Sequence, residues 1–516
     1  MLGVLLLVFL LMILYIWIME QHRYWVRKNM ISRKVVPIFG DFFLVLLGKE
    51  SFNDLLFRIY KKFHYARYIG GYRLLTPILV VRSPEIIKQI SVKEFGSFMD
   101  HMRLFPENKG DLFSKNLSQL KGQNWRNMRS ILSPVFTSSK MKGMFVLINH
   151  NSQSFVQHFL DRDHHTIEVQ FKDTFRRYCS DVIANTVFGL DINSLNDRGN
   201  EFYVMAKNAS NFSSFRRKFV FFLYYLSPFI SKMFRISFTS GEEQSFFVNF
   251  VKDTISLRED NNIKRQDILG FLLQMRKQHN EINDESEITK SQKSQRIESD
   301  LTEMDITALL FSFYLAGVDS TSDGMCFLAH ELALNPEIQK KLIEEIDRNR
   351  SDSVVVSHET ISKMPYLDMV ISELHRKWPI NVATDRVVTK PYTIQPELPN
   401  EKALHLDIGT NIVIPIYPIH HDPKYYEEPD KFDPERFAPE NKKNIHPFTY
   451  MPFGIGPRHC IASRFVVLVM KSVFFYLLSH FEIVTVEKTK KLLKMNKKSL
   501  SLTSEGNFDL GLKKRR

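Results

Sequence analysis

The stretch FGIGPRHC, Phe453–Cys460, decides how the rest of the chain is interpreted. Its two glycines, Gly454 and Gly456, permit a tight loop with backbone N–H groups turned inward, and Arg458 adds positive charge. Such surroundings stabilise a thiolate, which makes Cys460 a candidate metal ligand. The same pattern also suits a turn before a core helix, in which the cysteine is only a small buried apolar residue.

The composition is that of a large globular chain facing a reducing compartment. Its 516 residues, 44% of them hydrophobic, suffice for a sizeable core. Its 3 cysteines are too few for a disulfide framework, and they lack the C-x-x-C spacing of a structural zinc site. The formal net charge of +13 favours an anionic membrane surface or an acidic protein partner, because no nucleic-acid-binding motif accompanies it.

The N-terminal run, residues 1–19, is apolar, uncharged and long enough to cross a bilayer as a helix. A cleaved signal peptide has a shorter apolar region of about 7–15 residues that ends at small residues, unlike Tyr15, Ile16 and Trp17. We therefore predict a transmembrane signal anchor, a basic juxtamembrane segment with a proline hinge at 20–40, and a cytosolic domain at 41–516. Three glycosylation-type sequences, at Asn116, Asn208 and Asn211, are then expected to stay unmodified.

Helical patterns fill most of the chain, so the predicted fold class is mainly α with a small β portion. Short β-rich runs occur at Pro77–Val81 and Asn411–Pro415. The polar tract at about 279–300 predicts a solvated loop. Thr302 with Asp305 then gives a capping-box-like start to a long apolar helix that runs to about Asn335.

Two further patterns carry polar groups into the predicted core. Glu373 and Arg376 share one helix face, and Arg436 lies in a proline-marked loop downstream, which together favour a structural clamp over catalysis. Within the long helix, Gly317 costs about 1 kcal/mol relative to alanine and indicates a close neighbour or a local opening. The adjacent pair Asp319–Ser320 either delivers protons there or is a polar spot that faces water or another helix.

With these patterns in this order, the chain resembles a cytochrome P450 from the anchor to the C-terminus. The haem-binding signature F-x-x-G-x-R-x-C is met, as are E-x-x-R, P-E-R-F at Pro434–Phe437, and W-x-x-x-R. The stretches RKWPINVATDR and LSPVFTSSKMKGMF are similar to the insect microsomal, xenobiotic-metabolising branch. The resemblance implies the cytochrome P450 fold with an N-terminal transmembrane helix and haem b as cofactor. It implies these roles: Cys460 as the iron ligand; Phe453 in the haem-binding signature; Arg458, Arg386, Arg129 and Trp125 at the haem propionates; Asp319 and Ser320 in proton delivery.

The resemblance also has departures and a variable region. Ser320 stands where the family has threonine, so the hydroxyl loses the methyl that fixes its rotamer, and Ala462 replaces a glycine after the cysteine. The aromatic tract Asn211–Ile230 fits either a buried helix pair or a surface that enters lipid. The resemblance places its Phe212, Phe215 and their neighbours in a roof that touches both substrate and membrane, and Val382–Thr384 in the substrate pocket.

The implied activity is that of a haem-thiolate monooxygenase on the cytosolic face of the endoplasmic reticulum membrane. It inserts one atom of dioxygen into apolar xenobiotics or endogenous lipophiles, with electrons from NADPH through a flavoprotein reductase and possible help from a small haem electron-transfer protein. Lys121, Arg126 and Lys140 are candidate contacts for an acidic reductase. The alternatives are a reductase-independent haem-thiolate isomerase or dehydratase, and a non-catalytic haem sensor or lipophile binder; no nucleic-acid partner is expected.

Overall fold

The computed structural model describes residues 1–30, 35–103, 111–211, 214–226, 233–234, 237–284, 301–350, 356–399, 401–499 and 501–515. The chain divides into two compact units. Unit 1 comprises Met1–Arg103, His375–Cys460 and Lys494–Glu505, and unit 2 comprises Leu104–Leu374, Ile461–Leu493 and Gly506–Arg516. Of the residues that the structure describes, about 55% are helical and about 10% are in strands, which confirms the mainly α prediction.

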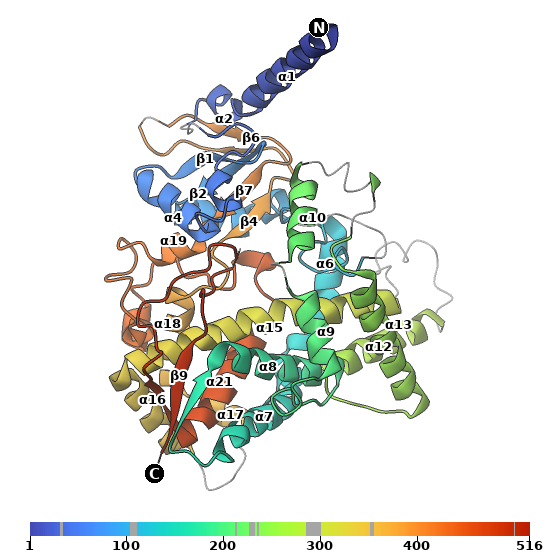
Figure 1. Ribbon diagram of the computed structural model, residues 1–516, viewed down its shortest axis with the longest axis vertical. Coiled ribbons are helices and arrows are strands. Elements are labelled where there is room, and N and C mark those ends of the chain that lie inside the picture. The colour runs from blue at the N-terminus through green and yellow to red at the C-terminus, as the bar shows by residue number, and fades with distance from the viewer. Residues whose placement is uncertain are drawn as a thin grey trace. The chain divides into compact units, whose positions relative to one another are not determined.

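Unit 1 is organised around a four-stranded sheet with the order β1-β2-β7-β4 (Figure 1). β1 (Tyr68–Arg73) and β2 (Thr76–Val81) form an antiparallel hairpin. β7 (Asn411–Ile414) runs parallel to β2 and antiparallel to β4 (Thr384–Val387). The two strands predicted from sequence, β2 and β7, are confirmed, and their runs TPILVV and NIVI are typical of buried strands.

The remaining elements of unit 1 surround this sheet. β5 (Tyr392–Ile394) and β6 (Leu404–Leu406) form a separate antiparallel pair. The helices are α1 (Leu2–Gln21), α2 (Tyr24–Arg27), α3 (Phe43–Leu46), α4 (Phe52–Lys62), α5 (Pro84–Lys88), η1 (Gln89–Lys93), η2 (Phe95–Ser97), α19 (Ile416–His420), η5 (Pro434–Phe437), α20 (Pro439–Lys442) and η6 (Gly456–Arg458). α18 (Pro365–Lys377) belongs to both units, because the division falls between Leu374 and His375.

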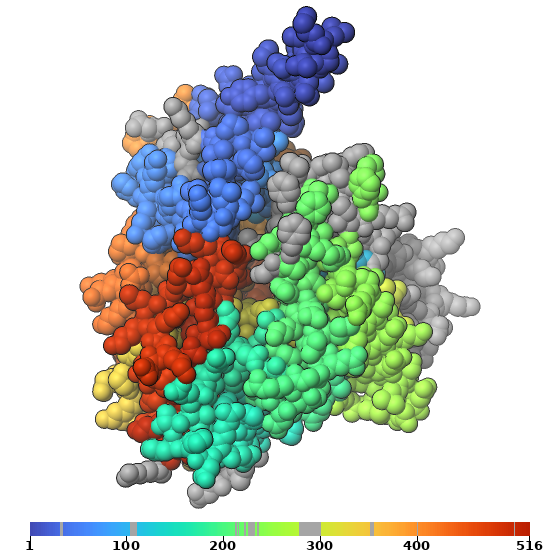
Figure 2. Space-filling model, viewed as in Figure 1, coloured from blue at the N-terminus to red at the C-terminus, as the bar shows by residue number. Residues whose placement is uncertain are grey.

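The segment that follows α1 is packed against the sheet of unit 1. α1 is apolar along its length and projects away from that sheet (Figures 1 and 2). Directly after it, the fully buried Trp25 donates its indole N–H to the carbonyl oxygen of Gly71 at 2.9 Å. A side chain on Gly70 would bring its Cβ to 2.5 Å from the Trp25 ring, so this glycine makes room for the indole. The connection after α1 is therefore anchored at Trp25, ahead of the predicted proline hinge.

Unit 2 is a helical body around α15 (Glu303–Leu334), which lies along α8 (Phe171–Ile183) (Figure 1). A three-stranded antiparallel sheet, β3-β9-β8, closes one side. Its other elements are α6 (Gly122–Leu132), η3 (Ser133–Phe136), α7 (Ser138–Leu160), β3 (Thr166–Gln170), η4 (Ala184–Phe188), α9 (Glu201–Ala209), α10 (Phe215–Leu226), α12 (Gly241–Asp260), α13 (Ile268–Asp284), α16 (Pro336–Asn349), α17 (His358–Ser362), α21 (Ser463–His480), β8 (Phe481–Thr485) and β9 (Asp509–Lys514).

The predicted start of the long helix is confirmed, while the predicted start of the preceding loop is wrong. Thr302 accepts a hydrogen bond from the Asp305 N–H, and the Asp305 side chain bonds back to complete a capping box. α13, however, continues to Asp284, beyond the expected end near His279. Polar residues extend a helix at little cost where their side chains reach solvent. The rest of the predicted loop, 285–300, lies outside the described residues.

Two helices among the described residues are long and apolar enough to cross a membrane, α1 and α21. α21 is mostly buried inside unit 2, as expected for a core helix. α1 is exposed along almost its whole length and lies near the N-terminus, a pattern that fits a membrane anchor and equally a signal sequence. Of the predicted aromatic roof, Phe212 and the side chain of Phe215 lie outside the described residues.

Candidate active site

The cysteine loop, Phe453–Cys460, adopts the tight turn that its glycines predicted. Gly454 and Gly456 have φ values of 76° and 71°, in the left-handed region that favours glycine. The Cys460 N–H donates to the Phe453 carbonyl oxygen at 2.8 Å and closes the loop. A Cβ on Gly456 would lie 1.9 Å from the carbonyl oxygen of Ser91, so the loop packs too closely there for any side chain. Cys460 is partly exposed, unlike the other two cysteines, Cys179 and Cys326, which are buried.

Two arginines of unit 1 are buried here, Arg458 within the loop and Arg386 beside it. Arg458 donates from Nε to the Met99 carbonyl oxygen at 2.8 Å. Arg386, which is 0% exposed, donates from Nη2 to the Ile455 carbonyl oxygen at 2.7 Å. Its Nε is buried without a hydrogen-bond partner among the described residues, and burial lowers the pKa of this guanidinium to about 10. A buried N–H donor without an acceptor suits an anionic group such as a carboxylate, so the residues present fit a haem propionate here.

A second set of contacts holds the chain segment that leads into the loop. Arg376 donates to the carbonyl oxygens of His420 and Lys431 at 3.0 and 3.2 Å, and Arg436 donates to that of Glu428 at 3.0 Å. The side chains of both arginines therefore bind main-chain carbonyl groups of other segments, as expected of a structural clamp. Glu373 is fully buried on α18, and its membership of the clamp stays a prediction.

His420 is a member of this region that sequence reasoning missed. The ring contacts Arg376 through one nitrogen and the backbone N–H of Met451 through the other. The local sequence gave one signal, a pair of adjacent histidines between the β-rich run at 411–415 and the P-E-R-F loop. A histidine in that position is equally compatible with simple core packing, so only its hydrogen bonds distinguish it.

The acid segment, Ala316–Thr321, lies in the middle of α15 in unit 2. A Cβ on Gly317 would come within 2.5 Å of Ile183 Cδ1, so a close neighbour explains this glycine, and α15 remains α-helical across it. The Ser320 hydroxyl donates to the Ala316 carbonyl oxygen at 2.5 Å, one turn earlier. This bond leaves the oxygen lone pairs of Ser320 as acceptors.

Asp319 is paired with a residue that the sequence did not indicate, Arg176 on α8. The guanidinium Nη2 lies 3.0 Å from Asp319 Oδ1 and also donates to Ser210 Oγ at 2.7 Å. Burial raises the pKa of the Asp319 carboxyl, while the positive charges of Arg176 and Lys172 oppose this rise. The acid is therefore held between desolvation, which favours its protonated form, and an ion pair, which favours its ionised form.

The remaining predicted haem contacts, Trp125 and Arg129, lie one turn apart on α6. Trp125 is buried and Arg129 is half-buried. Their spacing puts both side chains on one helix face, as the predicted role requires. That role stays a prediction, as does the assignment of every site residue to haem.

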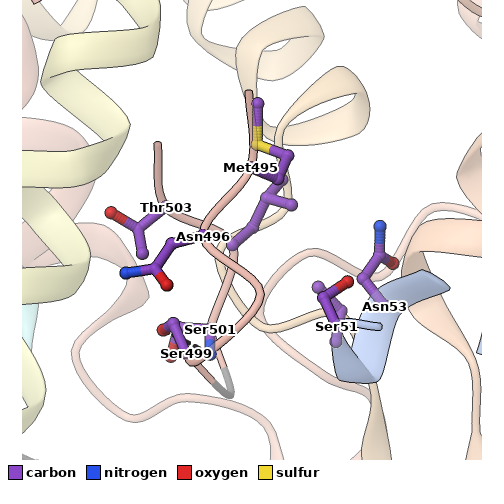
Figure 3. Close-up of a pocket in the computed structure, with 9 residues that line it drawn as sticks. Ser51, Asn53, Met495, Asn496, Ser499, Ser501 and Thr503 are labelled. Carbon is purple, nitrogen blue, oxygen red and sulfur yellow. Dashed lines mark hydrogen bonds between the residues drawn. The ribbon is translucent and has the colours of Figure 1, made fainter. Parts of the chain in front are cut away.

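A small pocket in unit 1 borders one of the predicted substrate-contacting residues, Val382 (Figure 3). Ser51 and Asn53 contribute one wall, and the loop at 495–503 contributes the other. Most of the lining side chains are hydroxyls and amides, and none belongs to the cysteine loop. Because none of the lining residues belongs to the cysteine loop or to the acid pair Asp319–Ser320, we place no step of the reaction there.

Comparison with known proteins decides the family. A family model described as Cytochrome P450 matches residues 32–510. The chain belongs to the cytochrome P450 family. This P450 is 38% identical to Cytochrome P450 9e2 of Blattella germanica, with 98% of this chain and 97% of the relative covered. It is 34% identical to Probable cytochrome P450 9f2 of Drosophila melanogaster, with 97% of each chain covered, and 35% identical to Cytochrome P450 3A18 of Rattus norvegicus, with 95% and 93% covered.

Membership confirms the recognition, the fold class, the enzyme class and the cofactor that the motifs implied. The protein is a haem b enzyme of the monooxygenase class, with insect relatives at 31–38% identity over nearly the full length. The apolar helix α1 is consistent with membrane anchoring. The family implies a redox partner and a hydrophobic substrate in general terms.

Proposed function

We propose that this P450 is a microsomal haem-thiolate monooxygenase that inserts one oxygen atom into apolar small molecules, either xenobiotics or endogenous lipophiles. The observation that carries the proposal is the cysteine loop, a closed turn that presents a partly exposed cysteine beside a buried, unsatisfied arginine N–H. Bound haem b supplies the redox-active iron at which dioxygen is reduced.

The residues of unit 1 hold the haem from the sulfur side. Cys460 provides the thiolate ligand, and the positive charge of Arg458 beside it stabilises that thiolate. The unpaired Nε–H of Arg386 would bind a propionate, and Arg129 and Trp125 on α6 of unit 2 stay predicted as further propionate contacts. Phe453 contacts the ring of His375 at a centroid distance of 4.7 Å, which fixes the start of the loop.

The residues of unit 2 handle protons. Asp319 carries the proton, and its raised pKa keeps the carboxyl protonated at higher pH than an ordinary aspartate. Ser320 accepts a hydrogen bond while its own proton is engaged with Ala316, so its hydroxyl orients a water or a reacting oxygen. To deliver a proton, Asp319 has to rotate away from Arg176 and then take up a new proton from solvent.

The proposed setting is the cytosolic face of the endoplasmic reticulum membrane, with α1 as the anchor and NADPH as the electron source through a flavoprotein reductase. Of the candidate reductase contacts, Arg126 is exposed on α6 and Lys121 precedes that helix. Lys140 lies over the ring of Phe271 at 4.2 Å, which restricts its side chain. Arg126 is therefore the contact we expect to matter most, through the rate of association and its salt dependence.

The proposal is tested by reconstitution with a purified NADPH-dependent flavoprotein reductase in phospholipid vesicles, with alkoxycoumarin probes as apolar substrates. We expect NADPH and oxygen consumption with dealkylated product, all of which require the reductase. A reductase-independent rearrangement of an organic hydroperoxide, without NADPH consumption, supports the isomerase alternative instead. Ligand-induced spectral change without any turnover, unaffected by Asp319→Asn, supports the sensor or binder alternative.

A further inference from the structure

We infer that His420 is a positioning residue that fastens the cysteine loop to α18 through a neutral imidazole. The inference rests on the proposed role of Cys460 as the haem ligand. It concerns the segment of unit 1 between α18 and the loop. Its basis is the hydrogen bonds of this fully buried histidine, in which one ring nitrogen accepts and the other donates.

The protonation state of His420 follows from its partners. One ring nitrogen, Nε2, lies 3.0 Å from the backbone nitrogen of Met451, which is a donor, so Nε2 has to accept. The other, Nδ1, lies 3.0 Å from the Arg376 carbonyl oxygen, which is an acceptor, so Nδ1 has to carry the proton. A doubly protonated ring would direct an N–H against the Met451 N–H. The geometry therefore requires the neutral tautomer with hydrogen on Nδ1.

The surroundings of His420 keep the ring neutral. The side chain is 0% exposed and stacks on the ring of Tyr450 at a centroid distance of 5.8 Å. Burial is the main cause that lowers the pKa of His420 well below its ordinary value, and the electrostatic effects of the neighbouring His421 and of the Arg376 guanidinium add to it. Arg376 in turn donates from Nη1 to the His420 carbonyl oxygen at 3.0 Å, so the two residues are bonded in both directions.

A continuous hydrogen-bond path leads from this pair to the cysteine. Met451, which bonds to His420, accepts at its carbonyl oxygen from the Gly454 N–H at 3.0 Å. Phe453, between them in sequence, accepts from the Cys460 N–H at 2.8 Å. The turn that presents the sulfur therefore begins on a backbone group that His420 holds. Without that acceptor, the Met451 N–H is buried and unpaired, and the loop can relieve this only by moving.

His421 offers a matched control in the next position. It is also buried, and burial lowers its pKa to about 3. Its described hydrogen bond, however, runs from Nδ1 to the Tyr417 carbonyl oxygen in the preceding turn, and its ring stacks on Tyr417 at 3.9 Å. Removing the nitrogens of His421 disturbs the same part of the core without touching Met451.

The experiment compares His420→Phe with His421→Phe in the full-length holoprotein. Phenylalanine keeps an aromatic ring at either position and removes both nitrogens. For His420→Phe we expect hydrogen exchange in the peptide 446–460 to accelerate by about tenfold, the factor expected for losing one buried hydrogen bond. We also expect part of the thiolate-type Soret band of the reduced carbon monoxide complex to convert to the thiol-type band. For His421→Phe we expect neither change.

Two further variants separate positioning from general destabilisation. In His420→Gln the longer side chain puts an acceptor where Nε2 was, while in His420→Asn the polar group reaches only the Nδ1 position. We expect His420→Gln to retain exchange protection and the thiolate band better than His420→Asn. If His420→Phe does not fold, the comparison of His420→Gln with His420→Asn is the test. Equal exchange protection and equal thiolate band in these two variants overturn the inference.

The inference is also overturned if His420→Phe keeps wild-type exchange and spectrum, or if His421→Phe loses both to the same extent. These outcomes differ from failure of the proposed function. In that case the wild-type protein itself lacks the thiolate band, or retains it after Cys460→Ser. The exchange measurement on the loop peptide remains informative in either event, because it does not depend on turnover.

Discussion

The cysteine loop of unit 1 and the acid segment of unit 2 are held in different ways. In the cysteine loop, two glycines adopt left-handed backbone conformations, and buried side chains bond to main-chain groups on either side. In the acid segment, the helix is regular, one hydroxyl bonds within its own turn, and one ion pair reaches Asp319. A loop with many fixed backbone contacts suits a ligand that must not move. A side chain held by a single ion pair suits a group that has to rotate and exchange its proton.

The largest expected effect tests the rigidity of the cysteine loop. In Gly456→Ala, the new Cβ meets the Ser91 carbonyl oxygen, and the positive φ adds about 1–2 kcal/mol of strain. We expect most of the haem-loaded protein to be lost, as measured by haem content per folded protein. Gly454→Ala is the matched control, because it has the same backbone strain but only His459 Cα nearby, at 3.8 Å. Equal losses in both variants would show that close packing at Ser91 is unimportant.

The next effect tests the acid segment without disturbing the loop. Asp319→Asn removes the proton donor while keeping the side chain's size, so we expect product formation to fall by about 100-fold, within the range for one acid–base group. Coupling, meaning the product formed per NADPH consumed, should fall, and the hydrogen peroxide released per NADPH should rise. The thiolate-type Soret band should stay unchanged, since the contacts of the loop remain. If Asp319→Asn formed as much product per NADPH as wild type, Asp319 would have no part in proton delivery.

A smaller effect concerns the ion pair that restrains Asp319. Arg176 opposes the rise in the Asp319 pKa that burial causes, so Arg176→Gln raises this pKa further. The carboxyl then stays protonated to higher pH. When coupling is plotted against pH, its decline on the alkaline side should therefore shift to higher pH. Arg176→Lys keeps the charge and should leave that decline close to its wild-type position. A shift to lower pH in Arg176→Gln would contradict the assignment of the decline to Asp319.

The smallest effect concerns Ser320, where the chain departs from the family pattern. Ser320→Thr adds a methyl that restricts χ1, with the hydroxyl already bonded to the Ala316 carbonyl oxygen. We expect a modest gain in coupling, worth at most about 1 kcal/mol, the scale of a rotamer preference. Peroxide formed per NADPH, measured beside wild type, detects it. A loss of coupling would show that the structure has no room for the added methyl group at this position of α15.

Local signals in the sequence sufficed for much of the fold and for the loop. The capping box at Thr302 and the apolar runs of β2 and β7 depend on near neighbours in sequence, and the glycines of the cysteine loop predicted its tight turn. The end of α13 was misjudged, because polar composition alone does not distinguish a helix from a loop. Arg176 and His420 were missed for another reason. Their roles depend on hydrogen bonds to residues distant in sequence, and no spacing rule encodes such pairs.

The central claim is that Cys460 is the thiolate ligand of the haem iron. The most direct measurement is the absorption spectrum of the reduced protein with carbon monoxide, recorded for wild type and for Cys460→Ser at equal haem content. We predict a strongly red-shifted Soret band in wild type and its complete absence in the variant, because only a thiolate ligand produces that shift. Absence of the band in folded, haem-loaded wild type, or its persistence in Cys460→Ser, would contradict the account.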